Sequence, residues 1–187
     1  MKNNPDIISQ KDGLILRLAT PEDALPYYEQ NYCPLDPEVA RLTGCQDEFS
    51  KEEVLSFFLK SIEDDDRVFF LILSADNKII GECVINEIDR KCRSANFRMA
   101  LFSQKERGKG IGTWAVKAAR DFAFEKLKLH RLALDVYSFN PRAENVYLKA
   151  GFQREGILKE AILDGDQYAD DILMALLEDE WKALKAE

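Results

Sequence analysis

The sequence has few of the side chains that bind transition metals. Among its 187 residues there is one histidine, His130, and the four cysteines form no Cys-x-x-Cys pair: Cys33, Cys45, Cys83 and Cys92. A structural zinc site usually needs four closely spaced cysteine or histidine ligands. We therefore expect no metal site, and we expect the cysteines to be free thiols in a reducing compartment.

Long apolar runs are missing as well. No stretch reaches the roughly 18 apolar residues of a membrane-spanning helix. Residues 1–6 are polar and lack the apolar core of a signal peptide. These two features predict a cytoplasmic protein with no membrane partner.

Positive charge is in deficit, with 26 lysines and arginines against 34 acidic residues and a net charge of −8. An acidic protein repels phosphate backbones, so we expect no nucleic-acid partner. A cationic amine would be attracted, although the acidity can equally serve solubility alone.

The remaining composition is that of an ordinary globular protein, with 46% hydrophobic residues. The length suits one domain. Residues 1–12 are expected to form a flexible N-terminal tail, and residues 13–187 a single domain.

Hydrophobic periodicity and helix-capping signals predict a mixed α/β fold. The predicted order is β-α-α-β-β-β-α-β-α-β-β, with an antiparallel meander in the middle and a short C-terminal helix at the end. The elements expected are a strand at 14–18, helices from Thr20 and Ser50, strands at 68–73, 79–88 and 95–102, a helix at 108–128, a strand at 132–137, a helix at 140–150, and strands at 153–162 and 169–177.

A glycine-rich turn joins the third meander strand to the next helix: Arg107-Gly108-Lys109-Gly110-Ile111-Gly112-Thr113. Free amides at a helix N-terminus attract an anion, and glycine lets a diphosphate approach the backbone. The spacing fits neither the Walker loop nor the dinucleotide fingerprint. The turn therefore indicates some other diphosphate ligand, or only a tight connection.

A second group of residues opens the helix after the next strand. Asn140 can cap this helix, with Pro141 at its first position. Ala143 and Tyr147 share a helix face with Asn140, and a tyrosine hydroxyl there can protonate a leaving thiolate. Tyr147 can also be a packed aromatic residue with no chemical role.

Together these two segments resemble the GCN5-related N-acetyltransferase (GNAT) family. Its pattern is Arg/Gln-x-x-Gly-x-Gly/Ala, followed about 30 residues later by Asn-x-x-Ala/Ser-x-x-x-Tyr-x-x-x-Gly-Phe. The residues that fit are Arg107, Gly110, Gly112, Asn140, Ala143, Tyr147, Gly151 and Phe152. The resemblance covers about residues 14–180 and implies a mostly antiparallel sheet flanked by helices.

The resemblance also implies a reaction and a set of site residues. Acetyl-CoA would give its acetyl group directly to a primary amine, without an acyl-enzyme. Tyr147 would protonate the CoA thiolate, and Asn140 would contact the pantetheine arm. The other cofactor-binding residues implied are Leu101, Phe102 and Ser103 at the pantetheine, and Arg107, Gly108, Lys109, Gly110, Ile111, Gly112 and Thr113 at the pyrophosphate.

A carboxylate is expected to take the proton of the amine. Glu87 is the first candidate and Glu82 the second. Some family members carry a glutamate on the following strand, where this sequence has Asn96.

The acceptor is less well defined. The likeness within the family is to spermidine acetyltransferases and ribosomal-protein alanine acetyltransferases. A small-molecule amine, with polyamines as one candidate, is the first interpretation. A protein N-terminal or lysine acetyltransferase and a non-catalytic acyl-CoA-binding module are the alternatives. The connection at 31–50 would set specificity, with acids that could line a polyamine channel or only be solvated: Asp36, Glu38, Asp47 and Glu48. Fold analogy makes a homodimer through the C-terminal strands a further expectation.

Overall fold

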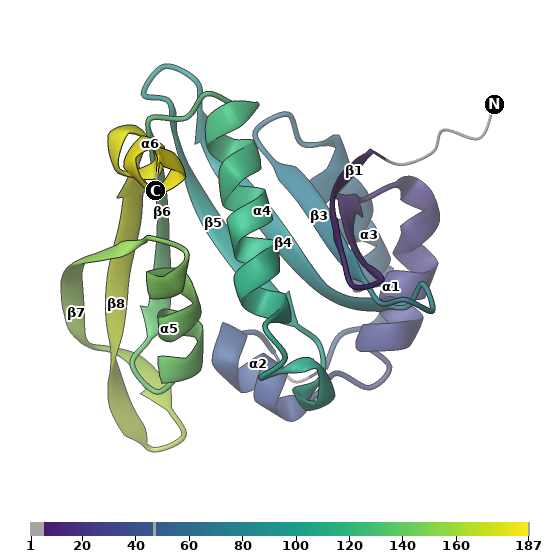
Figure 1. Ribbon diagram of the computed structural model, residues 1–187. Helices are drawn as coiled ribbons and strands as arrows, with labels where there is room; N and C mark the ends of the chain where they lie inside the picture. Colours follow the sequence, from purple (N-terminus) through teal and green to yellow (C-terminus); the bar gives the residue numbers. More distant parts are fainter. Residues whose placement is uncertain (1–5, 47, 187) are drawn as a thin grey trace.

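The computed structural model describes residues 6–46 and 48–186, and its centre is one eight-stranded sheet (Figure 1). The sheet order is β1-β2-β3-β4-β5-β6-β8-β7. The strands are β1 (Ile7–Lys11), β2 (Leu14–Leu18), β3 (Val68–Leu73), β4 (Ile79–Asp89), β5 (Ser94–Leu101), β6 (Arg131–Tyr137), β7 (Gln153–Asp164) and β8 (Gln167–Leu177).

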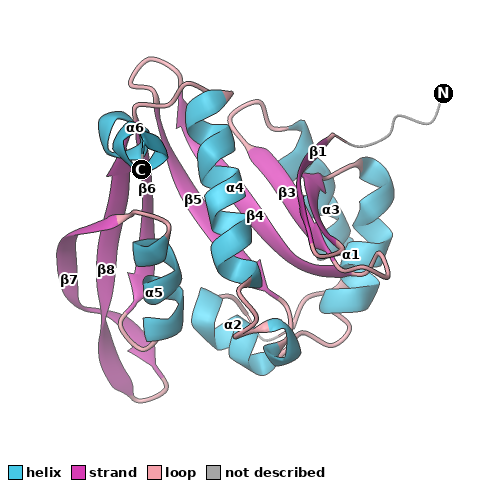
Figure 2. Ribbon diagram, viewed as in Figure 1, coloured by secondary structure: helices cyan, strands magenta, loops and turns pink. Residues whose placement is uncertain are grey.

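Helices cover both faces of this sheet (Figure 2). They are α1 (Ala24–Asn31), α2 (Pro37–Thr43), α3 (Lys51–Glu63), α4 (Ile111–Glu125), α5 (Pro141–Lys149) and α6 (Glu178–Ala186), with short 3₁₀ turns η1 (Pro21–Asp23) and η2 (Gln104–Glu106). No helix in the described part of the chain is long and apolar enough to cross a membrane. The mixed α/β class predicted from the sequence is confirmed.

The neighbouring strands β5 and β6 are parallel, whereas the other neighbours in the sheet are antiparallel. Their register covers three pairs, from Ser94 opposite Arg131 to Asn96 opposite Ala133. Beyond Asn96 the two strands diverge, as Figure 1 shows. The divergence opens the middle of the sheet.

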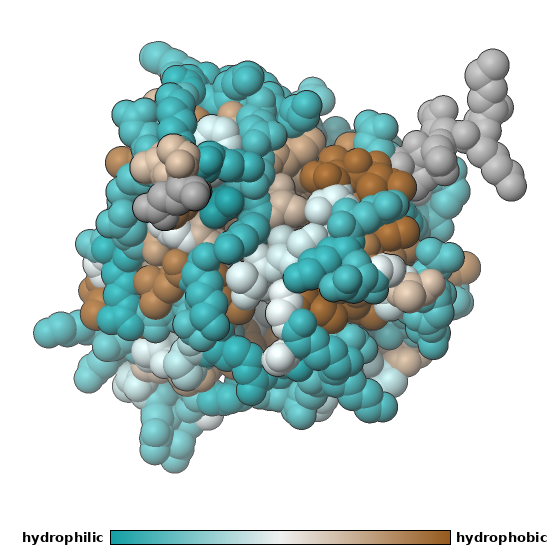
Figure 3. All heavy atoms as spheres, in the orientation of Figure 1, coloured by the Kyte–Doolittle hydropathy of each residue, from teal (hydrophilic) through white to brown (hydrophobic). Residues whose placement is uncertain are grey.

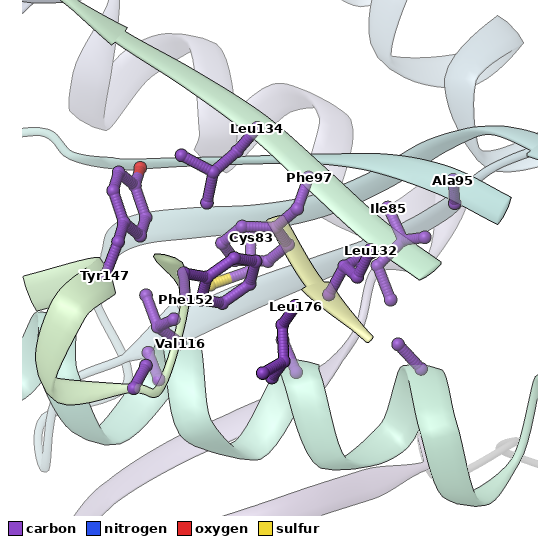
Figure 4. Packing of buried hydrophobic residues seen from close by; sticks show 14 of the residues in the cluster. Cys83, Ile85, Ala95, Phe97, Val116, Leu132, Leu134, Tyr147, Phe152 and Leu176 are labelled. Carbon is purple, nitrogen blue, oxygen red and sulfur yellow. The ribbon is translucent and has the colours of Figure 1, made fainter. Parts of the chain in front are cut away.

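The side chains of β4 alternate between two hydrophobic cores. Cys83 and Ile85 face the core under α4 and α5, and Val84 faces the core under α1, α2 and α3. Figure 4 shows part of the first core, where Phe97 and Phe152 pack against Val116 of α4. The Glu82 side chain points to the same face of the sheet as Val84, toward α1. This orientation decides which residues Glu82 contacts at the site.

Two expectations from the sequence were wrong. Residues 7–11, expected within a loose tail, pair with β2 as strand β1, after which Asp12 and Gly13 turn the chain with positive φ. Residues 1–5 lie outside the described residues. The connection 31–50, for which the sequence predicts no helix, contains α2, which begins after the cap Asp36 and ends at Gly44 with φ 66°.

The outer surface is mostly hydrophilic on the face that carries α4, with separate hydrophobic patches near β1 and beside the β7–β8 hairpin (Figure 3). The edge strand β7 is largely exposed along its length, including Ile157 and Leu158. The sheet therefore ends in an open edge on this side.

Candidate active site

A cavity of about 300 Å³ lies where β5 and β6 diverge. Its walls come from α2, β4, β5, the first turn of α4, β6 and α5. The glycine-rich turn and α5, which lie about 30 residues apart in the sequence, therefore meet at one cavity. Predicted site residues that line it are Leu101, Arg107, Gly112, Asn140 and Tyr147.

The glycine-rich turn has the backbone geometry that its glycines allow. Gly108 and Gly110 have φ of 78° and 80°, and a Cβ at either position would meet no atom within 4 Å. Gly110 is the N-cap of α4 and offers no side chain to its first amides. The turn thus leaves open space over the helix N-terminus, where the helix dipole favours an anion.

The two cations of this turn point in different directions. The Lys109 side chain is largely exposed, with Nζ 3.3 Å from a carboxylate oxygen of Glu106. The Arg107 side chain is only 10% exposed, and its Nη1 lies 2.8 Å from Oε2 of Glu38 on α2. Arg107 therefore joins the turn to α2 instead of lying free over the turn.

On α5, the capping expected from the sequence is confirmed. Oδ1 of Asn140 accepts the amide proton of Ala143 at 3.2 Å, and Pro141 occupies the first helical position. Asn140, Ala143 and Tyr147 all line the cavity, so the shared helix face predicted for them is the face toward the hollow.

Tyr147 is 5% exposed, and Figure 4 shows its ring rising from α5 with the hydroxyl away from α4. The ring packs against Phe97 and Phe152 at centroid distances of 6.4 and 6.0 Å. Burial raises the pKa of Tyr147, with smaller contributions from Cys83 and Asp135. The phenol consequently stays protonated at neutral pH and can act as a donor.

The three residues proposed at the pantetheine arm have different surroundings. Leu101 lines the cavity. The Phe102 amide donates to the carbonyl of Ile80 at 3.0 Å, and the Phe102 ring belongs to the core on the α1 side. Oγ of Ser103 accepts the amide proton of Lys105 and caps η2.

The two candidate bases lie in contrasting places. Glu87 is exposed and has a φ of 55°, because β4 carries an extra residue between the pairs Asn86–Asn96 and Asp89–Ser94. This bulge turns Glu87 out of the ladder, and Glu87 does not line the cavity. Glu82 is 5% exposed and does line it.

The carboxylate of Glu82 has two neighbours that no sequence motif identifies. The Tyr27 hydroxyl donates to Oε2 at 2.6 Å, and Nη2 of Arg98 lies 3.7 Å from Oε1. Tyr27 is 55 residues away along the chain. Only the packing of α1 on the sheet brings it to β4, so no local pattern could have identified it.

Of the acids in the 31–50 connection, the three that the structure describes do not line the cavity. Oδ1 of Asp36 accepts amide protons at the start of α2, and Glu38 pairs with Arg107. Glu48 is exposed, and position 47 lies outside the described residues. The α2 residues that line the cavity are Val39, Leu42 and Thr43.

Comparisons with known proteins identify the family of this chain. Residues 13–153 match the acetyltransferase (GNAT) domain family, so the chain belongs to this family and is an N-acetyltransferase. It is 30% identical over 132 residues to a spermidine N(1)-acetyltransferase of Vibrio cholerae, covering 71% of this chain and 76% of that protein. It is 26% identical to the ribosomal protein uS5-alanine N-acetyltransferase of Escherichia coli, covering 96% and 95%.

A solved structure shares the fold. The spermidine N-acetyltransferase from Vibrio cholerae in complex with CoA and spermine superimposes with a TM-score of 0.81 at 26% identity. The match covers 92% of this chain and 99% of that one.

Proposed function

We propose that the protein transfers an acetyl group from acetyl-CoA directly to a primary amine of a small molecule. The observation that carries the proposal is the cavity itself, which brings a buried carboxylate, Glu82, and a buried phenol, Tyr147, to one opening of the sheet. An amine acceptor needs a base, and a departing thiolate needs an acid. Membership in the GNAT family and the CoA complex of a relative support the choice of donor.

The cofactor would extend from the cavity to the N-terminus of α4. Its pyrophosphate would take the open space over residues 108–113, and its pantetheine arm would pass Leu101 and Asn140 into the gap between β5 and β6. The space over the glycines supports this placement because a diphosphate needs close approach to backbone amides.

The chemistry would proceed in one transfer step. Glu82 accepts a proton from the acceptor ammonium, and the neutral nitrogen attacks the thioester carbonyl carbon. The C–S bond breaks, and the sulfur takes the proton of Tyr147. The nitrogen then releases its second proton, which returns Tyr147 to its phenol form. Glu82 gives the first proton to solvent, so each ammonium acceptor yields one net proton. We prefer Glu82 to Glu87 as the base because only Glu82 lines the cavity.

Polyamines are the first acceptors to test, because spermidine acetyltransferases are among the relatives. Peptides with a free N-terminus follow, because the alanine acetyltransferase also matches. Thiol release from acetyl-CoA should be measured against spermidine, spermine, amino sugars, amino acids and peptides. Turnover with one class identifies the acceptor. CoA binding by calorimetry without turnover on any amine would instead support a non-catalytic binding module.

A homodimer is proposed as well. Strand β7 is the open edge of the sheet, and Ile157 and Leu158 are about half exposed there. A dodecameric structure is known for the Vibrio cholerae relative. Light scattering of the purified protein tests this, and a monomeric mass at all concentrations would contradict it.

A further inference from the structure

A chain of three polar side chains runs behind the wall of the cavity. The Tyr27 hydroxyl donates to Oε2 of Glu82 at 2.6 Å, and the hydroxyls of Tyr27 and Tyr32 lie 3.0 Å apart. Tyr27 has one hydroxyl hydrogen, which goes to Glu82, so Tyr32 must be the donor to Tyr27. The chain is therefore ordered from Tyr32 to Tyr27 to Glu82.

Tyr27 is held firmly in this chain. It is 1% exposed, and its ring packs against Phe58, Phe69 and Phe102 at centroid distances of 4.8, 6.0 and 5.6 Å. A ring packed on several sides keeps its hydroxyl in one place. Tyr27 is not among the residues that line the cavity, so its hydroxyl reaches Glu82 from behind.

The protonation of Tyr27 is fixed as well. Burial raises the pKa of Tyr27 far above its ordinary value, and the nearby Glu82 and Tyr32 raise it further. Burial and Glu82 likewise raise the pKa of Tyr32. Both phenols therefore keep their protons at neutral pH, and Tyr27 remains a donor to Glu82.

The consequence falls on the two oxygens of Glu82. Tyr27 occupies Oε2, which leaves Oε1 as the oxygen available to an acceptor. A charged group also lies near Oε1, because Nη2 of Arg98 on β5 is 3.7 Å away. Since Arg98 is too far for a hydrogen bond, Oε1 keeps a lone pair for the acceptor proton.

We propose that Tyr27 is a positioning residue, which holds the carboxylate of Glu82 in one orientation and leaves Oε1 for the acceptor's proton. This rests on the proposed function, in which Glu82 is the base. A fixed rotamer avoids the cost of orienting the base at each turnover.

The test compares three single substitutions that each remove one atom. Tyr27→Phe keeps the packed ring and removes only the donor to Glu82. Tyr28→Phe is the matched control, because Tyr28 is the next residue and its hydroxyl interacts with Cys33. Tyr32→Phe removes the outer member of the chain and should have an intermediate effect.

Two readouts separate positioning from a structural role. With the best acceptor of the amine panel, Tyr27→Phe should lower kcat about tenfold while the KM for acetyl-CoA is unchanged. The second readout is the ¹³C NMR signal of the Glu82 carboxyl group in the acetyl-CoA-free protein at neutral pH, assigned with Glu82→Gln. This signal should change position in Tyr27→Phe and stay in place in Tyr28→Phe, because only the first variant removes the hydrogen bond to Oε2. The measurement needs no acceptor.

Tyr27 and Tyr32 face Glu82 from the α1 side, and Arg98 faces it from β5. Cys83 is the neighbour of Glu82 in the strand and points into the other core, and Cys45 lies near Tyr32. A signal change seen in Tyr27→Phe and absent in Tyr28→Phe therefore belongs to the lost hydroxyl.

Each outcome decides between the two proposals. If Tyr27→Phe keeps the wild-type kcat and the wild-type Glu82 NMR signal while Glu82→Gln is inactive, the positioning role is overturned and the base assignment stands. If Glu82→Gln keeps full activity, both fall. Equal effects in Tyr27→Phe and Tyr28→Phe would also overturn the positioning role.

Discussion

The two sides of the cavity are built in different ways. The side proposed for the cofactor comes from the turn 103–113 and α5, where glycine conformation, helix capping and backbone amides decide the geometry. The side proposed for the acceptor comes from β4, β5, α1 and α2, where buried side chains such as Glu82 meet partners far away in the sequence.

This difference explains how each side can vary. A site made of backbone amides depends on a few local residues and tolerates changes elsewhere. A site made of long-range side-chain contacts changes whenever a contributing helix moves. Relatives with the same fold and different acceptors, such as those that acetylate spermidine and the ribosomal protein, fit this view.

The largest effect is expected on the acceptor side. Glu82→Gln should lower kcat/KM by a factor on the order of 10²–10⁴, because the variant cannot accept the amine proton. The binding of CoA measured by calorimetry should change little. The matched control is Glu87→Gln, which alters an exposed glutamate of the same strand and should leave turnover close to wild type. A loss of activity in Glu87→Gln with activity retained in Glu82→Gln would reverse our assignment.

On the side of the cavity proposed for the cofactor, Tyr147→Phe should lower kcat by a factor on the order of 10², because the thiolate must leave without a proton from the phenol. Thiol release at saturating acetyl-CoA measures this. The packing against Phe97 and Phe152 is kept in the variant, so the melting temperature should be nearly unchanged. Full activity would show that Tyr147 only packs.

The contacts that hold the start of α1, the helix that carries Tyr27, can be tested through the stability of the protein. Asp23 makes a bidentate pair with Arg17 at 2.6 and 2.7 Å, and both side chains are about nine-tenths buried. Asp23→Asn should therefore cost about 2 kcal/mol in the free energy of unfolding. Denaturant unfolding at neutral pH checks this, with Glu22→Gln in the same turn as a control of small effect.

The effect of Asp23 should also depend on pH. Burial alone would raise the pKa of Asp23, but its hydrogen bonds to Arg17 and Thr20 outweigh burial and lower it below the ordinary value of 3.8. The stabilisation is therefore complete above pH 3.8 and is lost as the pH falls through the lower, folded-state value. The difference in melting temperature between wild type and Asp23→Asn should shrink below about pH 4. A constant difference down to pH 2 would contradict this.

The smallest effect is expected for the glycine-rich turn, which is proposed to bind the cofactor. Gly110→Ala should weaken CoA binding by about tenfold, because a Cβ would enter the space proposed for the pyrophosphate. Gly165→Ala is the control, since Gly165 also has a positive φ and open space but lies in the β7–β8 turn. Both variants should lose about 1 kcal/mol of stability, and only the first should bind CoA less well. Equal affinities would argue against the placement of the pyrophosphate.

The cofactor side was largely predictable from the sequence because its signals are local. The glycine turn and the cap at Asn140 each follow from residues close together in the sequence, and Tyr147 shares a face with Asn140 two helix turns further on. Local signals were also available for two elements that were missed. Asp12-Gly13 is a strong hairpin signal before β2, and Asp36-Pro37 begins a helix in the same way as Asn140-Pro141.

The acceptor side could not be predicted in the same way. The bulge in β4 turns Glu87 outward, and one extra residue in a ladder leaves no clear mark in hydrophobic alternation. From the sequence Glu87 is the first candidate because it lies near the end of its strand, whereas in the structure Glu82 lines the cavity. The bond from Tyr27 joins residues 55 positions apart, and the pair of Arg107 with Glu38 depends on where α2 settles.

The pair formed by Arg107 and Glu38 makes the two sides of the cavity thermodynamically dependent on each other. Arg107 belongs to the glycine turn and Glu38 to α2, so one ion pair links the two sides. An anion that binds Arg107 competes with Glu38, and it therefore changes the free energy that holds α2 at the side proposed for the acceptor. By reciprocity, an acceptor that displaces α2 must change the affinity for that anion by the same factor.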